Sequence, residues 1–181
     1  SKNAKLMAAK NGIHIENEMI QDYVKKHPNS FDVVASFQVL EHVSAPLSFI
    51  QAKVDALKVG GKMIVAVPSQ DSFLKYAVNN ILNMPPHHVT RWPDETLQFV
   101  ADKYNLDLVT IYHEKLQNVH KLWFVKVLVD NSFMAPKLLS SSLIYRLISK
   151  VSSILARVLV RGLMDEMLPA GHTVIAVYQK K

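Results

Sequence analysis

The stretch that decides the fold reads FDVVASFQVLEHV at residues 31–43 and, after a short helical segment, LKVGGKMIVAVPSQDSF at residues 57–73. Its two apolar and β-branched runs, 31–36 and 62–67, are typical of strands buried in a parallel sheet. The residues between the two runs carry apolar side chains at helical spacing. Pro68 ends the second run because proline cannot donate to a sheet ladder. The passage therefore predicts a strand–helix–strand unit of an α/β fold.

The rest of the chain continues this alternation of helices and strands. Residues 2–11 are rich in Ala and Lys and end at Gly12, a residue that commonly terminates helices. A proline followed by two acids opens a helix at 93–104, since proline and acids favour the first helical turn. The remaining pattern predicts strands at 13–16, 106–112 and 172–179, a helix at 71–82 and an irregular stretch at 83–92.

The composition indicates one globular domain over residues 1–181. The hydrophobic fraction of 49% and the charged fraction of 20% are ordinary for such a domain. The chain has no cysteine, which excludes disulfides and thiolate metal sites and agrees with a reducing compartment. The first ten residues contain three lysines and no apolar run of the length that a signal peptide needs. We therefore expect a cytoplasmic protein.

The net charge of +6 is concentrated in one segment. Between residues 115 and 162, eight Lys or Arg residues stand against a single acid, Asp130, so the remainder of the chain is close to neutral. A protein that is basic over its whole surface in order to bind nucleic acid would not show this distribution. We expect no nucleic-acid partner.

Residues 115–170 form a helical insertion between the last two predicted strands. Within it, 143–161 is strongly apolar apart from one narrow polar stripe. Three interpretations stay open: a lid over a substrate site, peripheral contact of 143–161 with a membrane of anionic headgroups, and a helical cap with a solvated stripe. Basic residues interrupt every apolar window of about 18 residues, which argues against a membrane span. The stripe consists of Arg146, Lys150, Ser153, Arg157 and Arg161.

The passages at 31–43 and 57–73 resemble class I methyltransferases that depend on S-adenosylmethionine (SAM), of the methyltransferase-domain type. Ubiquinone-pathway O-methyltransferases and enzymes that modify sugars or polysaccharides are examples. The resemblance covers about residues 1–112, and the order and spacing of the elements carry it. It implies a Rossmann-like α/β sheet, SAM as cofactor, and O-methylation of a small-molecule acceptor.

The resemblance also implies which residues face the cofactor. In open α/β sheets, ligands bind at the carboxyl ends of the strands. Ser36, Phe37 and Gln38, at the end of the first strong strand, are therefore expected to lie near the methionine end of SAM. Glu18 and Met19 occupy the region that borders the adenine in the family, with a solvent-exposed loop as the alternative.

The histidines of the PPHH sequence at 85–88 are the candidate catalytic residues. Methyl transfer to a hydroxyl group needs alignment and a proton acceptor, and histidine titrates near neutral pH. His87 or His88 is therefore expected to act as the base, unless the pair only caps the following helix. Arg91 and Trp92 are expected to line the acceptor side of the site, although an aromatic residue there is also typical of a core.

A metal site is the less favoured interpretation of Glu41 and His42. In ubiquinone-pathway relatives a similar Glu-x-x-Glu-His stretch is associated with a divalent metal. Gln38 replaces the first of these acids, and an amide is a weaker ligand for a hard cation than a carboxylate. We therefore predict no metal, with Glu41 and His42 starting the next helix and shaping the floor of the site.

The glycine-rich SAM-binding turn of the family, GxGxG, is absent from the sequence. The five glycines stand at 12, 60, 61, 162 and 171, and no two of them form GxG. The acid that holds the SAM ribose at the end of the family's second strand is also absent, and relatives carry it just upstream of a segment that resembles residues 1–12. We expect a fragment that begins immediately after that acid, with a sheet incomplete at its N-terminal side, and that does not bind SAM with normal affinity.

The missing turn also has a consequence for the sheet. In the family's strand order, 3-2-1-4-5-7-6, the missing strands lie between 13–16 and 31–36, so the strand at 31–36 would expose a long apolar edge unless another chain or a dimer partner covered it.

The alternative function is a degenerate methyltransferase-like module that interacts without catalysing. A nucleic-acid methyltransferase is the weaker third option. Relatives that methylate amino groups carry Asn/Asp-Pro-Pro-aromatic after the central strand, and this chain has SFQV there.

Overall fold

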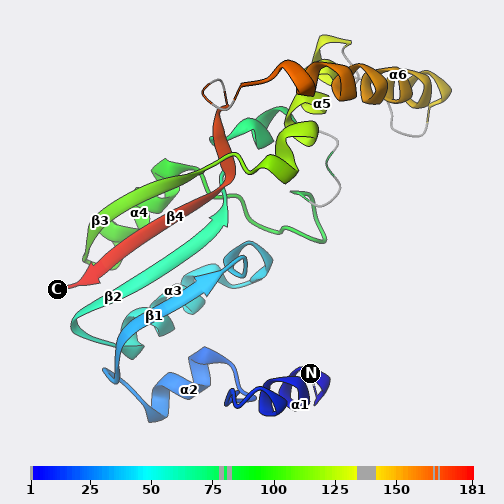
Figure 1. Cartoon of the computed structure of the whole chain (residues 1–181). Helices are drawn as coiled ribbons and strands as arrows, with labels where there is room; N and C mark the ends of the chain where they lie inside the picture. Colours follow the sequence, from blue (N-terminus) through cyan, green and yellow to red (C-terminus); the bar gives the residue numbers. More distant parts are fainter. Residues whose placement is uncertain (1, 78–79, 81–82, 134–141, 165, 167) are drawn as a thin grey trace.

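The computed structural model of the chain describes residues 2–77, 80, 83–133, 142–164, 166 and 168–181, and its centre is a four-stranded sheet (Figure 1). The strands follow the order β1-β2-β4-β3. β1 and β2 are parallel, whereas β4 is antiparallel to both of its neighbours. The carboxyl ends of β1 and β2 therefore meet the beginning of β4 at one edge of the sheet. The strands are β1 (Phe31–Phe37), β2 (Leu57–Pro68), β3 (Leu106–Lys115) and β4 (Ala170–Lys180).

The predicted strand–helix–strand unit is confirmed as β1, α3 (Pro46–Ala56) and β2. The two glycines lie inside β2, where the pairing with β1 skips residues between Leu57 and Lys62. Gly60 has a φ of +77°, and a Cβ on Gly61 would lie 2.9 Å from the carbonyl oxygen of Lys58. Glycine is therefore required at this irregularity for both backbone conformation and space.

The helices α3 and α4 (Asp94–Lys103) pack on one face of the sheet, and α2 (Ile20–Lys26) packs against α3. The core between them is built from alternate residues of β2 and β4 together with apolar residues of α3 and α4. The hydroxyl of the fully buried Tyr178 donates to the carbonyl oxygen of Leu97 at 2.9 Å, which joins β4 to α4. Asp71 accepts a hydrogen bond from the Asp94 backbone N–H at 2.7 Å, so a residue outside α4 caps its first turn.

The outer edge of β1 is exposed, as the sequence predicted. Among the described residues no strand pairs with it, and its side chains Val33 and Phe37 are 53% and 61% exposed. The strand predicted at 13–16 is wrong, since this segment runs without regular structure between α1 (Lys2–Lys10) and α2. A short strand is stable only with a neighbour to share its ladder hydrogen bonds, and the described part of the chain gives this segment none.

The helix predicted at 71–82 forms only a short 3₁₀ turn, η2 (Phe73–Tyr76), in its described part, and positions 78–79 and 81–82 lie outside the described residues. The hydroxyl of Ser72 accepts from the Leu74 N–H and starts this turn. The helical insertion is confirmed as α5 (Lys121–Ser132) and α6 (Leu143–Leu159), which lie together at one end of the sheet (Figure 1). α5 packs its aromatic residues against Phe73 of η2, with ring centroids 5.0–5.5 Å apart.

A buried lysine joins α3 to the sheet. Lys53 is 1% exposed, and its ammonium donates to the hydroxyl of Ser36 at 2.7 Å and to the carbonyl oxygen of Ile64 at 3.0 Å. Burial disfavours the charged form and lowers the pKa of Lys53 to about 7. Between pH 7 and the ordinary lysine range, Lys53 is therefore less protonated in the folded protein than in the unfolded chain.

This difference predicts that stability rises with pH because of Lys53. Between its folded pKa of about 7 and its ordinary value of 10.5, the unfolded state binds more protons, so raising the pH favours folding. The contribution reaches roughly 1.4 kcal/mol per pH unit. Urea unfolding between neutral pH and moderately alkaline pH should show this slope in the wild type and lose it in Lys53→Met. Lys58→Met, which removes a half-exposed lysine, is the control and should keep it. Equal slopes in all three proteins would contradict the prediction.

Candidate active site

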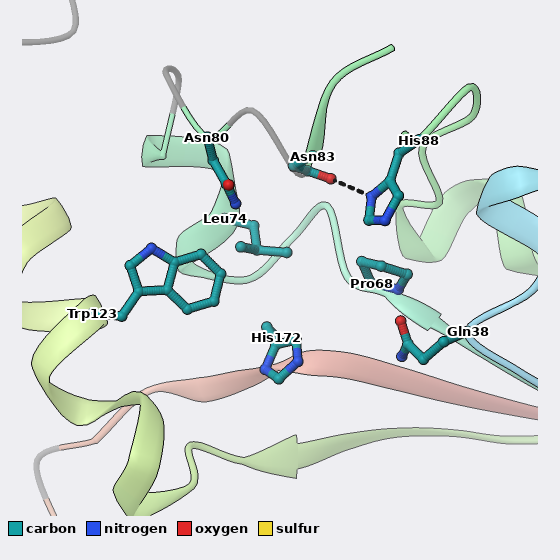
Figure 2. A pocket seen from close by; sticks show the side chains of 8 residues that line it. All are labelled: Gln38, Pro68, Leu74, Asn80, Asn83, His88, Trp123 and His172. Carbon is teal, nitrogen blue, oxygen red and sulfur yellow. Dashed lines mark hydrogen bonds between the residues drawn. The ribbon is translucent and has the colours of Figure 1, made fainter. Parts of the chain in front are cut away.

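A cavity of about 430 Å³ lies where β1 and β2 end and β4 begins (Figure 2). This is the edge at which the parallel pair of strands was expected to bind a ligand. Four different parts of the chain meet here: the strand ends, η2, the stretch before α4, and α5 of the insertion. The lining residues are Gln38, Pro68, Leu74, Asn80, Asn83, His88, Trp123 and His172.

Gln38 turns the chain sharply at the end of β1. Its φ of +53° lies in the left-handed region, which is uncommon for a residue with a side chain. Its backbone N–H donates to the carbonyl oxygen of Ala66 at 2.9 Å, and its side-chain amide reaches the hydroxyl of Thr173 at 3.5 Å. Backbone conformations of this kind cluster at functional sites, because the surrounding structure must hold them in place.

His172 enters the cavity from the first part of β4. The backbone N–H of Ser69, just after β2, donates to the His172 carbonyl oxygen at 2.7 Å and fixes this part of the strand. In Figure 2 the ring projects into the cavity between Trp123 and Gln38. Its centroid lies 6.0 Å from that of Trp123 and 4.4 Å from that of His120.

Glu114 stands behind His172. One carboxylate oxygen lies 3.3 Å from Nδ1 of His172, outside hydrogen-bond geometry, and accepts from the Thr173 backbone N–H at 3.2 Å. A Cβ on Gly171 would lie 2.7 Å from Cγ of Glu114, so glycine makes this close approach possible. Burial lowers the pKa of His172, the nearby His120 lowers it further, and the Glu114 carboxylate opposes both. His172 is therefore a neutral imidazole at neutral pH.

The structure separates the two predicted catalytic histidines. His88 lines the cavity and its Nδ1 bonds to Oδ1 of Asn83 at 3.0 Å, so Nδ1 carries the proton and Nε2 keeps a lone pair. Burial, His42 and His87 all lower the pKa of His88. The side chain of His87 is exposed, and it is the backbone carbonyl oxygen of His87 that accepts from His42 Nδ1 at 2.6 Å.

Glu41, His42 and His88 form a cluster whose candidate ligand atoms all lie within 4.8 Å of one another. Glu41 belongs to the 3₁₀ helix η1 (Leu40–His42) and is 1% exposed, and neither of its carboxylate oxygens has a hydrogen-bond partner. Burial raises the pKa of Glu41. Both histidines donate from Nδ1 to oxygen acceptors, which leaves Nε2 free on each ring. Histidines that bind metals through Nε2 typically donate from Nδ1 to an oxygen acceptor in this way.

The predicted cofactor-facing residues do not lie together, and only one of them lines the cavity. Gln38 lines the cavity, whereas the Ser36 side chain is buried toward α3, where Lys53 binds its hydroxyl, and Phe37 is exposed at the end of β1. Glu18 pairs with Lys26 at 2.9 Å, and Met19 is an exposed residue that precedes α2. Neither Glu18 nor Met19 lines the cavity. Contact of these residues with a cofactor stays a prediction.

Trp92 requires a correction, because it belongs to the core and not to the acceptor side of the site. It is 5% exposed and packs with the apolar residues of β2, β4 and α4. Its indole N–H donates to the Thr90 hydroxyl at 2.9 Å, which satisfies its only polar group inside the protein. Arg91 is exposed and borders a smaller hollow of about 80 Å³.

Sequence reasoning missed six lining residues: Pro68, Leu74, Asn80, Asn83, Trp123 and His172. Among them, His172 carried a usable signal. His172 is the first residue of the predicted last strand, and an antiparallel strand begins at the edge where parallel neighbours end. Trp123 had no such signal, because its place in the cavity depends on how the insertion packs.

Comparison with known proteins gives a consistent result. Residues 4–111 match the methyltransferase-domain family. A ubiquinone biosynthesis O-methyltransferase of Klebsiella pneumoniae is 29% identical over 133 residues, which are 66% of this chain and 54% of that protein. The chain therefore spans about half the length of the relatives that it matches.

Two solved structures have a similar fold. A SAM-dependent methyltransferase from Thermotoga maritima superposes with a TM-score of 0.62 at 16% identity, covering 100% of this chain and 70% of its own. One from Archaeoglobus fulgidus gives a TM-score of 0.58 at 16% identity, with 97% and 71% covered. At these identities the likeness shows the fold alone.

The placement of Glu114 predicts a measurable effect on His172. Because the carboxylate favours the charged imidazolium, Glu114→Gln should lower the pKa of His172 further. Titration of the His172 ring proton by NMR measures this shift. Asp32→Asn removes an exposed carboxylate that pairs with Lys58 and should leave the His172 pKa unchanged. An unchanged pKa in Glu114→Gln would mean that the two side chains do not interact in solution.

Proposed function

Since this chain belongs to the methyltransferase-domain family, we propose that it forms the acceptor side of the active site of a SAM-dependent O-methyltransferase. The observation that carries the proposal is the position of His88. It lines a cavity at the carboxyl ends of β1 and β2, and its pKa is lowered, so that it is a neutral base at neutral pH. The relatives named as ubiquinone biosynthesis O-methyltransferases support O-methylation over other methyl transfers.

The residues of this chain have a limited task in such a reaction. When bound, SAM supplies a methyl group activated by its sulfonium. The protein must hold the acceptor hydroxyl in line with that group and accept its proton. His88 Nε2 would accept the proton of the acceptor hydroxyl, and the Asn83 amide keeps the ring in the tautomer that leaves Nε2 free. Trp123, Leu74 and Pro68 exclude water from one side of the cavity.

The residues present fit the methionine side of SAM. Gln38 projects into the cavity from a strained turn directly after β1, where the fold brings a ligand close to backbone. The five glycines of the chain do not supply a GxGxG turn. We propose that a glycine-rich segment outside these 181 residues binds the adenosine side.

The lining of the cavity favours an acceptor with a flat apolar body and more than one polar substituent. The indole of Trp123 offers a face for stacking, and Leu74 and Pro68 add apolar surface. The two asparagines, Asn80 and Asn83, place amide groups in the lining. A hydroxylated aromatic or quinone-like ring suits this arrangement better than a sugar, whose ring offers no aromatic face and whose hydroxyls need more partners.

The cluster of Glu41, His42 and His88 supports a second role for His88, as a ligand of a divalent cation. The donor set fits, because a buried carboxylate without a partner and two imidazole Nε2 atoms lie together. A cation there would lower the pKa of an acceptor hydroxyl without a protein base. The sequence argument against a metal rested on Gln38, and His88 supplies a third donor in place of that acid.

We expect His88→Gln to reduce kcat for methyl transfer by roughly a hundredfold or more, the usual loss on removing a general base. The KM for SAM should change little. The longest natural form of the protein should be assayed with labelled SAM and protocatechuate, a catechol. Wild-type activity should persist when the pH is lowered below the ordinary histidine range. It should fall only when the pH is lowered further, through the reduced pKa of His88, because the base then becomes protonated.

His87→Gln is the matched control, because the side chain of His87 is exposed and its main-chain carbonyl remains. Equal losses in the two variants would contradict the assignment of His88. Titration with Mn²⁺ by calorimetry separates the two roles of His88. Binding to the wild type that is lost in both Glu41→Gln and His88→Gln, with activity lost on chelation, would identify His88 as a cation ligand and not as the base.

The 181-residue chain by itself should not bind SAM with micromolar affinity, because it lacks the glycine-rich turn. Isothermal titration calorimetry of SAM against this chain measures this directly. Micromolar binding would refute the proposed need for a further segment. If the longest natural form also fails to bind SAM, the alternative of a methyltransferase-like interaction module without catalysis is favoured.

A further inference from the structure

The helix α6 has its apolar face on the outside. Large apolar side chains are exposed along its whole length, and two of them in its middle, Leu147 and Ile154, are each 65% exposed. At 100° per residue these side chains occupy one continuous arc of the helix. The arc contains Leu143, Ile144, Leu147, Val151, Ile154, Leu155, Val158 and Leu159.

The inner face of α6 is made of small and polar side chains. Ser152 and Ala156 are its fully buried residues, and they lie toward α5. Ser149 accepts a hydrogen bond from Lys126 of α5 at 3.3 Å, and the same ammonium pairs with Asp130 at 2.6 Å. Asp130, the only acid between residues 115 and 162, is therefore neutralised between α5 and α6, away from the outer arc.

The orientation of α6 is opposite to that of α4, which is an ordinary amphipathic helix. In α4 the apolar residues Leu97, Val100 and Ala101 are buried against the sheet, and the polar residues face solvent. A soluble protein rarely exposes an apolar face of the length of α6 without a partner for it. The packing of α6 on α5 through small residues therefore keeps its apolar arc free.

A basic stripe borders the apolar arc. Arg146, Lys150, Arg157 and Arg161 fall beside one another along one edge of it, and all four are exposed. No acid occurs between residues 143 and 162. Within the part of the chain that the structure describes, none of the four forms an ion pair. The face therefore combines exposed apolar surface with uncompensated positive charge.

We propose that α6 docks the protein onto the surface of an anionic phospholipid bilayer. The apolar arc lies in the headgroup and acyl boundary, and the basic stripe contacts the phosphate and anionic headgroups beside it. Among the described residues no helix has the length and apolar character to cross a bilayer. The contact is thus parallel to the membrane plane, along the 17 residues of α6.

The charge pattern selects a lipid surface over a second copy of the chain. Two α6 faces packed against each other would bring two basic stripes together with no acid on either side to pair with them. An anionic bilayer supplies the opposite charge over an extended area. The same pattern argues against a basic or neutral protein partner.

The docking surface is connected to the cavity through α5. This helix contributes Trp123 to the cavity lining and packs against α6 on its other side. Figure 1 shows α5 and α6 together at the end of the sheet toward which β2 points. Docking through α6 therefore brings the cavity near the membrane, where an acceptor with an apolar tail would be found; this last step rests on the proposed function, whereas lipid binding does not.

Vesicle flotation without SAM or acceptor tests the proposal independently of methyl transfer. The protein should float with vesicles in which phosphatidylglycerol replaces part of the phosphatidylcholine, and binding should weaken as salt is raised. Each basic residue near an anionic surface contributes roughly fivefold to the partition coefficient, so replacing Arg146, Lys150 and Arg157 with serine should reduce it by roughly a hundredfold. Leu147→Ser with Ile154→Ser should also abolish flotation, and both sites are exposed enough for the fold to tolerate the change.

Matched controls replace similar residues on other elements. Lys10, Lys62 and Lys103 are exposed lysines outside the insertion, and Val59 and Phe99 are exposed apolar residues. Their serine variants should float like the wild type. The proposal is overturned if the protein fails to float with anionic vesicles or binds neutral vesicles equally well. It is also overturned if Leu147→Ser with Ile154→Ser converts a dimer to a monomer without affecting flotation, since the face would then join two copies.

Discussion

The whole site depends on the position of β2 between a parallel and an antiparallel neighbour. Because β1 runs parallel to β2, both strands end at one edge of the sheet, and because β4 runs antiparallel, it begins there. Three backbone segments therefore change direction at one place. Hydrogen bonds from Gln38 to Ala66 and from Ser69 to His172 then hold these segments in register. Without this arrangement Gln38, Pro68 and His172 would not surround a common cavity.

The sequence predicted the elements that its local pattern determines. The strand–helix–strand unit, the last two strands, α4 and the helical insertion are confirmed, because buried strands and helix termini depend on residues close in sequence. The Rossmann-like α/β class is confirmed as well. The prediction of a strand at 13–16 was wrong because a strand depends on a partner that can be distant in sequence, and not on the local pattern alone. α2 was missed because its seven residues are too few to show a clear helical period.

The site was predicted less completely, because its residues come from segments far apart in the chain. The sequence predicted a ligand near Gln38 from its place after a strand and a base at His87 or His88 from histidine chemistry. Gln38 and His88 do line the cavity, but the sequence could not separate His88 from His87. The two histidines differ because Asn83 binds the ring of His88, whereas the ring of His87 is exposed to solvent. Trp92 was misplaced because an aromatic residue near a loop looks the same in sequence whether it faces a ligand or the core. Its packing against β2 and β4 is a tertiary fact.

The insertion shows how one sequence pattern permits opposite structures. An apolar arc beside a basic stripe fits a lid, a cap or a membrane-facing helix, and the composition of α6 alone does not choose among them. The inner face of α6 argues against the cap. A cap would bury its large side chains, yet α6 buries Ser152 and Ala156 and leaves Leu147 and Ile154 outside. Small residues allow two helices to approach closely and bury little apolar surface. α6 therefore packs on α5 without burying its large apolar side chains. Exposing that face in water costs free energy, and the proposed contact with a bilayer offsets this cost at the acyl boundary, while anionic headgroups compensate the positive charge beside the face.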